Sequence, residues 1–141
     1  MQADAENLRL FVYGTLLSGE REHALLEGAE LIGAVRTAPS YTLVDLGPYA
    51  ALVERGTVSV TGELYRIDRK MRFRLDVKRE VPVLFQRIFV ALEDGTRAET
   101  YAMKDEQVRG KRRLADGDWR QRFAPRPRAE GLRGVGRGRP R

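Results

Sequence analysis

The chain has 141 residues, a length that fits one domain with a sizeable core and is too short for two ordinary domains. Apolar residues make up 42% and charged residues 33%, as in soluble globular proteins, and no apolar run is long enough to cross a bilayer. Cysteine is absent, and the first residues lack the basic start and apolar stretch of a secretory signal. We therefore expect neither disulfides nor export, and take a cytoplasmic setting as the default.

The net charge of +6 is concentrated at one end of the chain. Between residues 124 and 141, six arginines face one acidic residue, Glu130, which is a charge of +5 and leaves +1 for residues 1–123. The Pro, Gly and Arg content of this stretch leaves too little apolar surface to offset the entropy lost on ordering it. We predict one domain over residues 1–123 and a disordered, Arg-rich tail over residues 124–141.

The first half of the chain predicts several short strands and one short helix. Residues 8–12 are an apolar, strand-like run that ends at the glycine turn Tyr13-Gly14-Thr15-Leu16. A segment from Ser18 to Gly28 has the polar start and glycine end of a short helix. Further strands are expected over residues 31–35, 41–44 and 50–53, with a turn over residues 54–56. Residues 58–67 alternate as in a half-buried strand, where Gly62 indicates a bulge or a close approach.

The second half predicts another helix and a hairpin. Asp68 is placed to cap a short helix over residues 68–78 that presents Met71 and Leu75 on one face. Residues 84–92 and 97–103 predict two strands joined by a tight turn at Asp94-Gly95. Many short strands with two short helices favour an α+β fold, built on a small mixed sheet that curls toward a barrel.

Five short motifs follow one another over residues 8–122. They are Phe11-Val12-Tyr13-Gly14-Thr15-Leu16, Val60-Thr61-Gly62-Glu63-Leu64-Tyr65, Leu75-Asp76 through Pro82 with Phe85-Gln86-Arg87, Ala98-Glu99-Thr100-Tyr101, and Gly117-Asp118-Trp119-Arg120. Each motif is weak alone, but in this order they together resemble the gamma-glutamylcyclotransferase-like family. The resemblance implies a small α+β barrel-like domain that needs no cofactor.

The resemblance also implies a reaction, the release of a γ-linked glutamyl group as 5-oxoproline. The substrate's own α-amine attacks its γ-carbonyl, so an enzyme has to bend the glutamyl chain and move protons, which a single carboxylate can do. Main-chain amides of the glycine turn would anchor the α-carboxylate and the oxygen of the tetrahedral intermediate. The simpler interpretation of this turn is a strand end. The implied substrate-binding residues are Tyr13, Gly14, Thr15, Leu16, Arg79 and Tyr101.

One position departs from the family's pattern. The proton-carrying glutamate of Leu-Asp-x-x-Glu falls on Arg79, whose guanidinium stays protonated and neither accepts nor passes on a proton. Glu80 is the nearest substitute, although a one-residue step on a helix turns the side chain by about 100°. Pro82 favours an irregular helix end, which would change that direction.

Two main hypotheses follow. In the first, Glu80 is the catalytic acid/base and the protein processes a small γ-glutamyl substrate. In the second, Arg79 turns the site into an anion-binding pocket that holds a carboxylate ligand or a protein partner without turnover. Phe85 stands where the family has tyrosine and so lacks a hydroxyl, while Tyr101 keeps one and either lines the pocket or packs in the core. Glu63 is expected to be a solvent-facing or structurally paired strand residue.

The remaining signals favour structural roles. His23 is the only histidine, so the chain cannot assemble a metal site from soft ligands, and we expect it on the surface of the first helix. Trp119 is expected to seal the end of the domain by packing. The Arg-Gly-rich tail allows a third hypothesis, nucleic-acid binding through phosphate contacts, beside the simpler account of a solubilising extension.

Overall fold

The computed structural model describes residues 8–123, so the tail predicted for residues 124–141 lies outside the described residues. Strand β1 (Leu8–Val12) lies inside the sheet, antiparallel to β5 (Thr61–Ile67) and parallel to β7 (Arg97–Met103). Leu10, Phe11 and Val12 are all buried. The apolar run Leu10-Phe11-Val12 at the end of β1 therefore fits a strand that is covered on both faces there.

The sheet is mixed and open. Its strands run in the order β2-β5-β1-β7-β4-β3-β8, and β6 pairs with β7 off this path. The other strands are β2 (Glu30–Arg36), β3 (Tyr41–Asp45), β4 (Ala50–Val58), β6 (Gln86–Ala91) and β8 (Arg112–Arg113). Strand β7 is parallel to β1 and β4, and the remaining pairs are antiparallel. The α+β class and the mixed sheet are confirmed, but the path ends at β2 and β8 without closing into a barrel.

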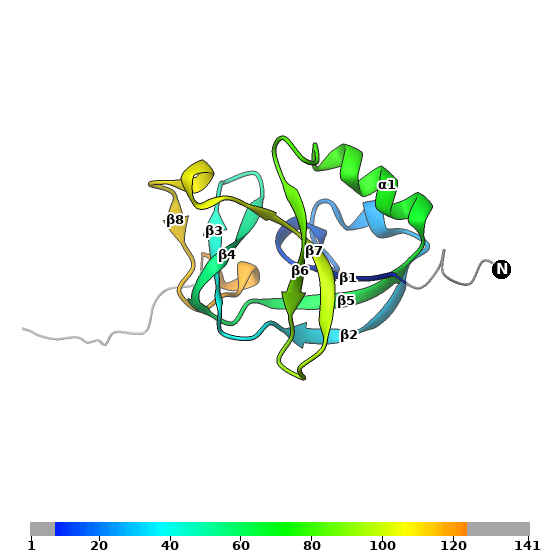
Figure 1. The fold of residues 1–141 in the computed structure, drawn as a ribbon, viewed down its shortest axis with the longest axis horizontal. Helices are drawn as coiled ribbons and strands as arrows, with labels where there is room; N and C mark the ends of the chain where they lie inside the picture. The colour runs from blue at the N-terminus through cyan, green and yellow to red at the C-terminus, as the bar shows by residue number, and fades with distance from the viewer. Residues whose placement is uncertain (1–7, 124–141) are drawn as a thin grey trace, which may run out of the picture.

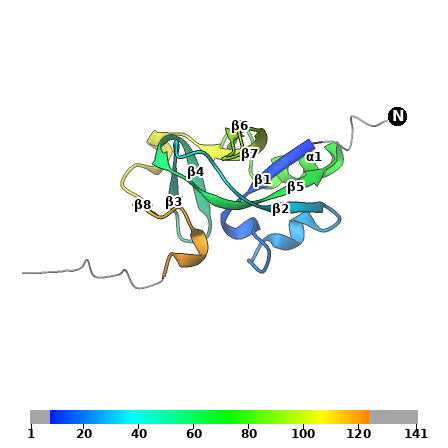
Figure 2. The same ribbon diagram turned by 90° about the horizontal axis from the view of Figure 1, so that it is seen from below.

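The two halves of the sheet separate in space. Strands β1, β2 and β5 lie at one end of the molecule with helix α1 (Arg69–Lys78), and β3, β4 and β8 lie at the other (Figures 1 and 2). Helix α1 begins as predicted, because Asp68 Oδ1 accepts a hydrogen bond from the Met71 N–H at 2.8 Å. Met71 and Leu75 are its buried residues, as its sequence pattern predicts. Within residues 8–123, no helix is long and apolar enough to span a bilayer.

The helix expected from Ser18 to Gly28 is wrong in length and kind. The segment forms only a short 3-10 helix, η3 (His23–Leu26). Gly19 and Gly28 have φ angles of +81° and +97°, which no α-helix accommodates. The Glu22 N–H donates instead to the Thr15 carbonyl at 2.8 Å, so this segment folds back onto the turn after β1.

Two strand boundaries also differ from expectation. Strand β4 does not stop at Val53 but runs to Val58, and the expected turn becomes an excursion within the strand. Thr42 pairs with Val53 and Tyr41 with Val58, so residues 54–57 have no counterpart in β3. The strand expected over residues 58–67 is interrupted before Thr61, where the Val60 N–H donates to Thr37 Oγ1 at 2.9 Å.

Close packing explains two of the glycine-containing motifs. A Cβ on Gly62 would lie 2.3 Å from the Val12 carbonyl oxygen and 2.5 Å from the Phe11 ring, which confirms the expected close approach. The Gly117 carbonyl accepts a hydrogen bond from the Thr61 N–H at 2.9 Å, next to the start of β5.

Trp119, in the 3-10 helix η5 (Trp119–Gln121), is buried, so its predicted packing role is confirmed. The β6–β7 hairpin and its Asp94-Gly95 turn also form as predicted.

Candidate active site

The turn that follows β1, residues 13–16, contains the short 3-10 helix η2 (Gly14–Leu16), whose residues are all buried. Gly14 has a φ of +65°, and a Cβ there would lie 2.8 Å from the Cβ of Ala50, so both backbone and space require glycine. The first hydrogen bond of the turn joins the Leu16 N–H to the Tyr13 carbonyl at 3.4 Å. The N–H groups of Gly14 and Thr15 precede that bond, so the turn itself does not use them.

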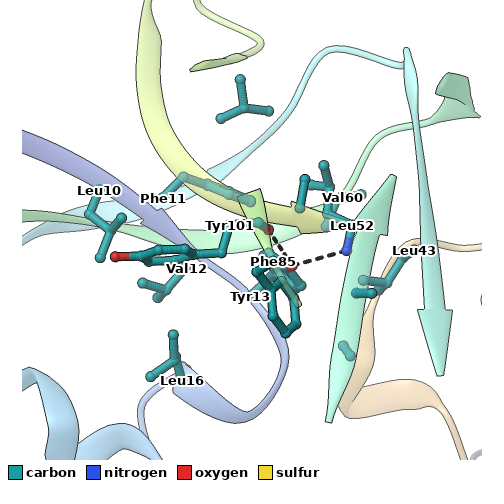
Figure 3. Close-up of a cluster of buried hydrophobic side chains, with 14 of the residues drawn as sticks. Leu10, Phe11, Val12, Tyr13, Leu16, Leu43, Leu52, Val60, Phe85 and Tyr101 are labelled. Atoms are coloured by element: carbon teal, nitrogen blue, oxygen red, sulfur yellow. Dashed lines mark hydrogen bonds between the residues drawn. The ribbon is translucent and has the colours of Figure 1, made fainter. Parts of the chain in front are cut away.

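Tyr13 connects three strands through its hydroxyl. The hydroxyl accepts a hydrogen bond from the Leu52 N–H at 2.9 Å and donates one to the Tyr101 carbonyl at 2.5 Å (Figure 3). Burial raises the pKa of Tyr13 to about 12, against the opposing effects of the Leu52 hydrogen bond and the Arg79 charge. The hydroxyl therefore stays protonated at neutral pH and fixes β1 to β4 and β7.

A small cavity lies between this turn and the segment after α1. Its lining includes Tyr13, Thr15 and Leu16 from the turn, Arg79 from the end of α1, and Tyr101 from β7. The volume is about 10 Å³, close to the smallest space that holds one water molecule. The structure thus brings the glycine turn and Arg79 to the same cavity, although they are far apart in the sequence.

Arg79 forms a largely buried ion pair with Glu22. Its Nη2 lies 2.9 Å from Glu22 Oε1, and its Nη1 lies 3.4 Å from Glu22 Oε2. The Thr15 hydroxyl also donates to Glu22 Oε1, and the guanidinium lies 5.4 Å from the ring centroid of Phe85. The side chains of Arg79 and Glu22 are 9% and 23% exposed, so solvent screens the pair only weakly.

Glu22 is the carboxylate that the sequence patterns did not single out. Burial alone would raise the pKa of Glu22, but hydrogen bonds from Arg79 and Thr15, with the nearby guanidinium charge, hold it below its ordinary value. Nothing in the segment Ser18-Gly19-Glu20-Arg21-Glu22 distinguishes this glutamate from Glu20. Its importance arises from the fold, which carries it to two residues of the cavity lining.

A larger groove lies elsewhere, between η3 and α1. Its volume is about 630 Å³, and its lining includes the exposed side chains of Phe73 and Val77. It contains neither the residues of the turn nor Arg79. The small cavity, rather than the larger groove, is therefore lined by the turn and by Arg79, the partner of Glu22, and we take it as the candidate site.

Comparison with known proteins places this arrangement in a family. The sequence pattern described as Gamma-glutamyl cyclotransferase, AIG2-like matches residues 10–121. The chain belongs to this family. A Vibrio cholerae protein named "Putative gamma-glutamylcyclotransferase" is 42% identical over 113 residues, which are 80% of this chain and 96% of that protein.

Solved structures agree with the family assignment. The crystal structure of an uncharacterized protein from Pyrococcus horikoshii matches with a TM-score of 0.67 at 26% identity, covering 82% of this chain and 92% of that one. The solution NMR structure of ytfP from Escherichia coli matches with a TM-score of 0.62 at 32% identity, covering 79% and 96%. The fold is thus that of gamma-glutamyl cyclotransferase, AIG2-like proteins.

Glu80 is the residue considered above as the catalytic acid/base. Its side chain is exposed and is not part of the cavity lining. Its backbone has a φ of +52°, which takes the chain out of the helix at this residue. The helix end is therefore irregular, as expected, but the irregularity directs Glu80 away from the cavity, and this position does not favour the acid/base role considered for it.

Two aromatic residues complete the comparison with the family pattern. Phe85 is buried against Tyr49, with ring centroids 5.8 Å apart. The Arg79 guanidinium lies over the Phe85 ring. Tyr101 lines the cavity, but its hydroxyl donates to Asp76 Oδ1 at 2.7 Å, and Asp76 also binds Arg87. Burial, together with the hydrogen bond to Asp76, raises the pKa of Tyr101. The Tyr101 hydroxyl thus secures β7 to α1.

Glu63 is a structurally paired residue, which was one of the two expected outcomes. Its Oε1 accepts from the Ser18 N–H at 2.9 Å and from the Tyr65 hydroxyl at 3.0 Å, and its Oε2 accepts from the Ser18 hydroxyl at 2.6 Å. Arg120 Nη2 lies 3.5 Å from Oε2. Burial would raise the pKa of Glu63, but these donors outweigh it and lower that pKa. Glu63 therefore anchors the loop after the glycine turn to β5.

His23 is partly buried rather than fully on the surface. Its Nδ1 lies 2.9 Å from the Leu16 carbonyl oxygen, and its ring centroid lies 5.9 Å from that of Tyr65. Within residues 8–123, no group of three His, Asp or Glu side chains is arranged to hold a metal ion. His23 thus helps to hold η3 against the turn.

Proposed function

We propose that this protein releases 5-oxoproline from a γ-glutamyl amine or peptide. The α-amine of the glutamyl group attacks its γ-carbonyl carbon, a new C–N bond closes the five-membered ring, and the bond to the departing amine breaks. The α-nitrogen loses two protons in total and the departing nitrogen gains two. Proton carriage and stabilisation of the negative oxygen are therefore the tasks left to the protein.

One observation carries this proposal: the glycine turn and Arg79 line a single cavity, and Glu22 bonds to two residues of its lining, Thr15 and Arg79. The N–H groups of Gly14 and Thr15 are available for an oxyanion, because they precede the first hydrogen bond of the turn. Arg79 supplies a positive charge beside them, and Glu22 supplies a carboxylate. Membership of the gamma-glutamyl cyclotransferase, AIG2-like family supports the same reaction class.

A second candidate function is favoured by Arg79 itself. A guanidinium cannot carry the proton that the glutamate of the family pattern carries, but it binds a carboxylate well. The protein would then hold a small carboxylate ligand, or a partner that presents one, without turnover. A third function, nucleic-acid binding by residues 124–141, depends on residues outside the described part of the chain.

The test is an assay for free 5-oxoproline, with γ-L-glutamyl amines and dipeptides beside their α-linked isomers. The α-linked isomers contain the same atoms, but their α-amine cannot close a five-membered ring on the linked carbonyl. Release from the γ-linked compounds alone would support the proposal. A parent protein that binds these compounds without release, and gains release through Arg79→Glu, would establish the second function instead.

For the tail, the full chain and residues 1–123 can be compared on RNA and DNA columns at low salt. Equal retention would eliminate the nucleic-acid hypothesis, because phosphate contacts by the six tail arginines would be lost on truncation.

A further inference from the structure

The Arg79–Glu22 pair presents two opposite charges side by side at the edge of the cavity. Each charge has a second support, since Glu22 accepts from the Thr15 hydroxyl and Arg79 lies over the Phe85 ring. The supports come from different elements, so the two side chains are held independently of each other. When the contact between them is broken, the Thr15 hydroxyl still holds Glu22, while the Arg79 guanidinium can move.

The cavity is too small for a glutamyl group while this ion pair is closed. Its volume of about 10 Å³ fits at most one water molecule, whereas a glutamyl group has ten non-hydrogen atoms, counting the amide nitrogen. Arg79 is part of the lining, so movement of its guanidinium away from Glu22 enlarges the cavity. A ligand that enters has to offer each partner of the ion pair a new opposite charge, because an unpaired buried charge is costly.

An α-amino acid head group satisfies this requirement. It carries one carboxylate and one ammonium on the same carbon, and these charges are opposite in sign to those of Arg79 and Glu22. We infer that the head group of the γ-glutamyl substrate inserts into the Arg79–Glu22 pair, with its α-carboxylate on Arg79 and its α-ammonium on Glu22. This inference rests on the proposed function, and it assigns the proton-carrying role to Glu22, the ion-pair partner of Arg79.

The exchange also prepares Glu22 to take a proton. In the unliganded protein, Arg79 is one of the groups that hold the pKa of Glu22 low. Once the substrate's α-carboxylate neutralises Arg79, the α-ammonium replaces the guanidinium as the partner of Glu22, and an ammonium, unlike a guanidinium, can give up a proton. It accepts the two protons of the α-nitrogen one at a time and returns each to the departing nitrogen, so the proton count balances.

Other acidic groups near the site are committed elsewhere. Glu63 is held by Ser18, Tyr65 and Arg120, and Asp76 is held by Tyr101 and Arg87. Glu80 is exposed. Asp76 also bonds to a lining residue, Tyr101, but it shares its carboxylate with Arg87, whereas Glu22 bonds to two lining residues, Thr15 and Arg79.

The binding test uses three related compounds with the full chain. They are N5-ethyl-L-glutamine, its methyl ester at the α-carboxylate, and N-ethylglutaramic acid, which lacks the α-amine. NMR titrations of the parent protein, read before product accumulates, should show that loss of either charge weakens binding about tenfold or more. In Glu22→Gln, loss of the amine should change the affinity by no more than about twofold, because its partner charge is already absent.

Turnover provides the second readout. Glu22→Gln should lower kcat about 100-fold or more, Glu22→Asp should recover part of the loss, and the matched control Glu27→Gln on the exposed end of η3 should behave as the parent. Equal affinity of the parent for all three compounds, or no binding of any of them, would overturn the inference. Those measurements use the parent alone and so do not depend on the folding of a variant.

The two proposals fail in different ways. If the parent discriminates the three compounds but releases no 5-oxoproline, the inferred binding site stands. The proposed function and the proton-carrying role of Glu22 are then both refuted. If the parent releases 5-oxoproline and Glu22→Gln releases it at the same rate, the proposed function stands and the role of Glu22 is refuted.

Discussion

The guanidinium of Arg79 lies 2.9 Å from the carboxylate of Glu22, a residue 57 positions earlier in the chain. This contact joins the end of α1 to the segment after the glycine turn, and both partners are mostly buried. It bonds a cation of the cavity lining to a carboxylate from another segment of the chain. The pair is therefore both a structural tie and the main chemical feature of the candidate site.

A double-mutant cycle should detect this tie in the stability of the protein. Glu22→Ala and Arg79→Met should each lower the free energy of unfolding by about 2 kcal/mol, because each leaves a poorly solvated partner unpaired. The double variant should be less destabilised than the sum of the two, with a coupling of about 1 kcal/mol or more in urea denaturation. Additive losses would show that the contact contributes nothing of its own, and Glu27→Ala serves as the exposed control.

The pKa values of Glu63 and Glu22, which are both lowered from 4.5, predict acid sensitivity. A carboxyl whose pKa is lower in the folded state contributes stability that is fully present above its unfolded pKa and is lost as pH falls through the folded value. The parent should therefore lose stability below about pH 4.5, and Glu63→Gln should lose less over the same range while being less stable at pH 7. Thermal melts from pH 7 to pH 3 provide the measurement, and parallel pH curves would contradict it.

Gly62→Ala should be strongly destabilising. The added Cβ would lie 2.3 Å from the Val12 carbonyl oxygen, and the buried β1 strand has no room to move away. We expect a loss of about 1–3 kcal/mol in chemical denaturation, the usual cost of overpacking a core. Gly33→Ala on the neighbouring strand β2 is the matched control, because nothing lies within 4 Å of its Cβ position. Similar behaviour of the two variants would argue against the close approach.

Glu80→Gln should leave turnover within about twofold of the parent, since the exposed carboxylate is outside the cavity lining. Glu80→Gly should do the same without loss of stability, because glycine adopts a φ of +52° without the steric cost that glutamate bears. The measurements are 5-oxoproline release and thermal unfolding. A large drop in release for Glu80→Gln alone, with unchanged folding, would return the acid/base role to Glu80.

Short-range patterns predicted much of the architecture. The apolar run of β1, the Asp68 cap of α1 and the Asp94-Gly95 turn depend on residues within a few positions of one another, and all form as expected. The segment after Ser18 fails as a helix because Gly19 turns the chain and Glu22 bonds back to Thr15. Its helix-like composition does not indicate that the Glu22 N–H bonds to Thr15 rather than to a carbonyl within a helix.

The five motifs in order were enough to indicate the family, and the number of short strands and helices indicated the α+β class. The tertiary structure alone decided that Glu22 meets Arg79, that Glu80 is exposed, and that the hydroxyls of Tyr13 and Tyr101 are used to connect strands and helix. The physical reason is the range of the interactions involved. Strand and cap preferences act between near neighbours, whereas the pairing of a buried charge depends on which distant segments the folded sheet brings together.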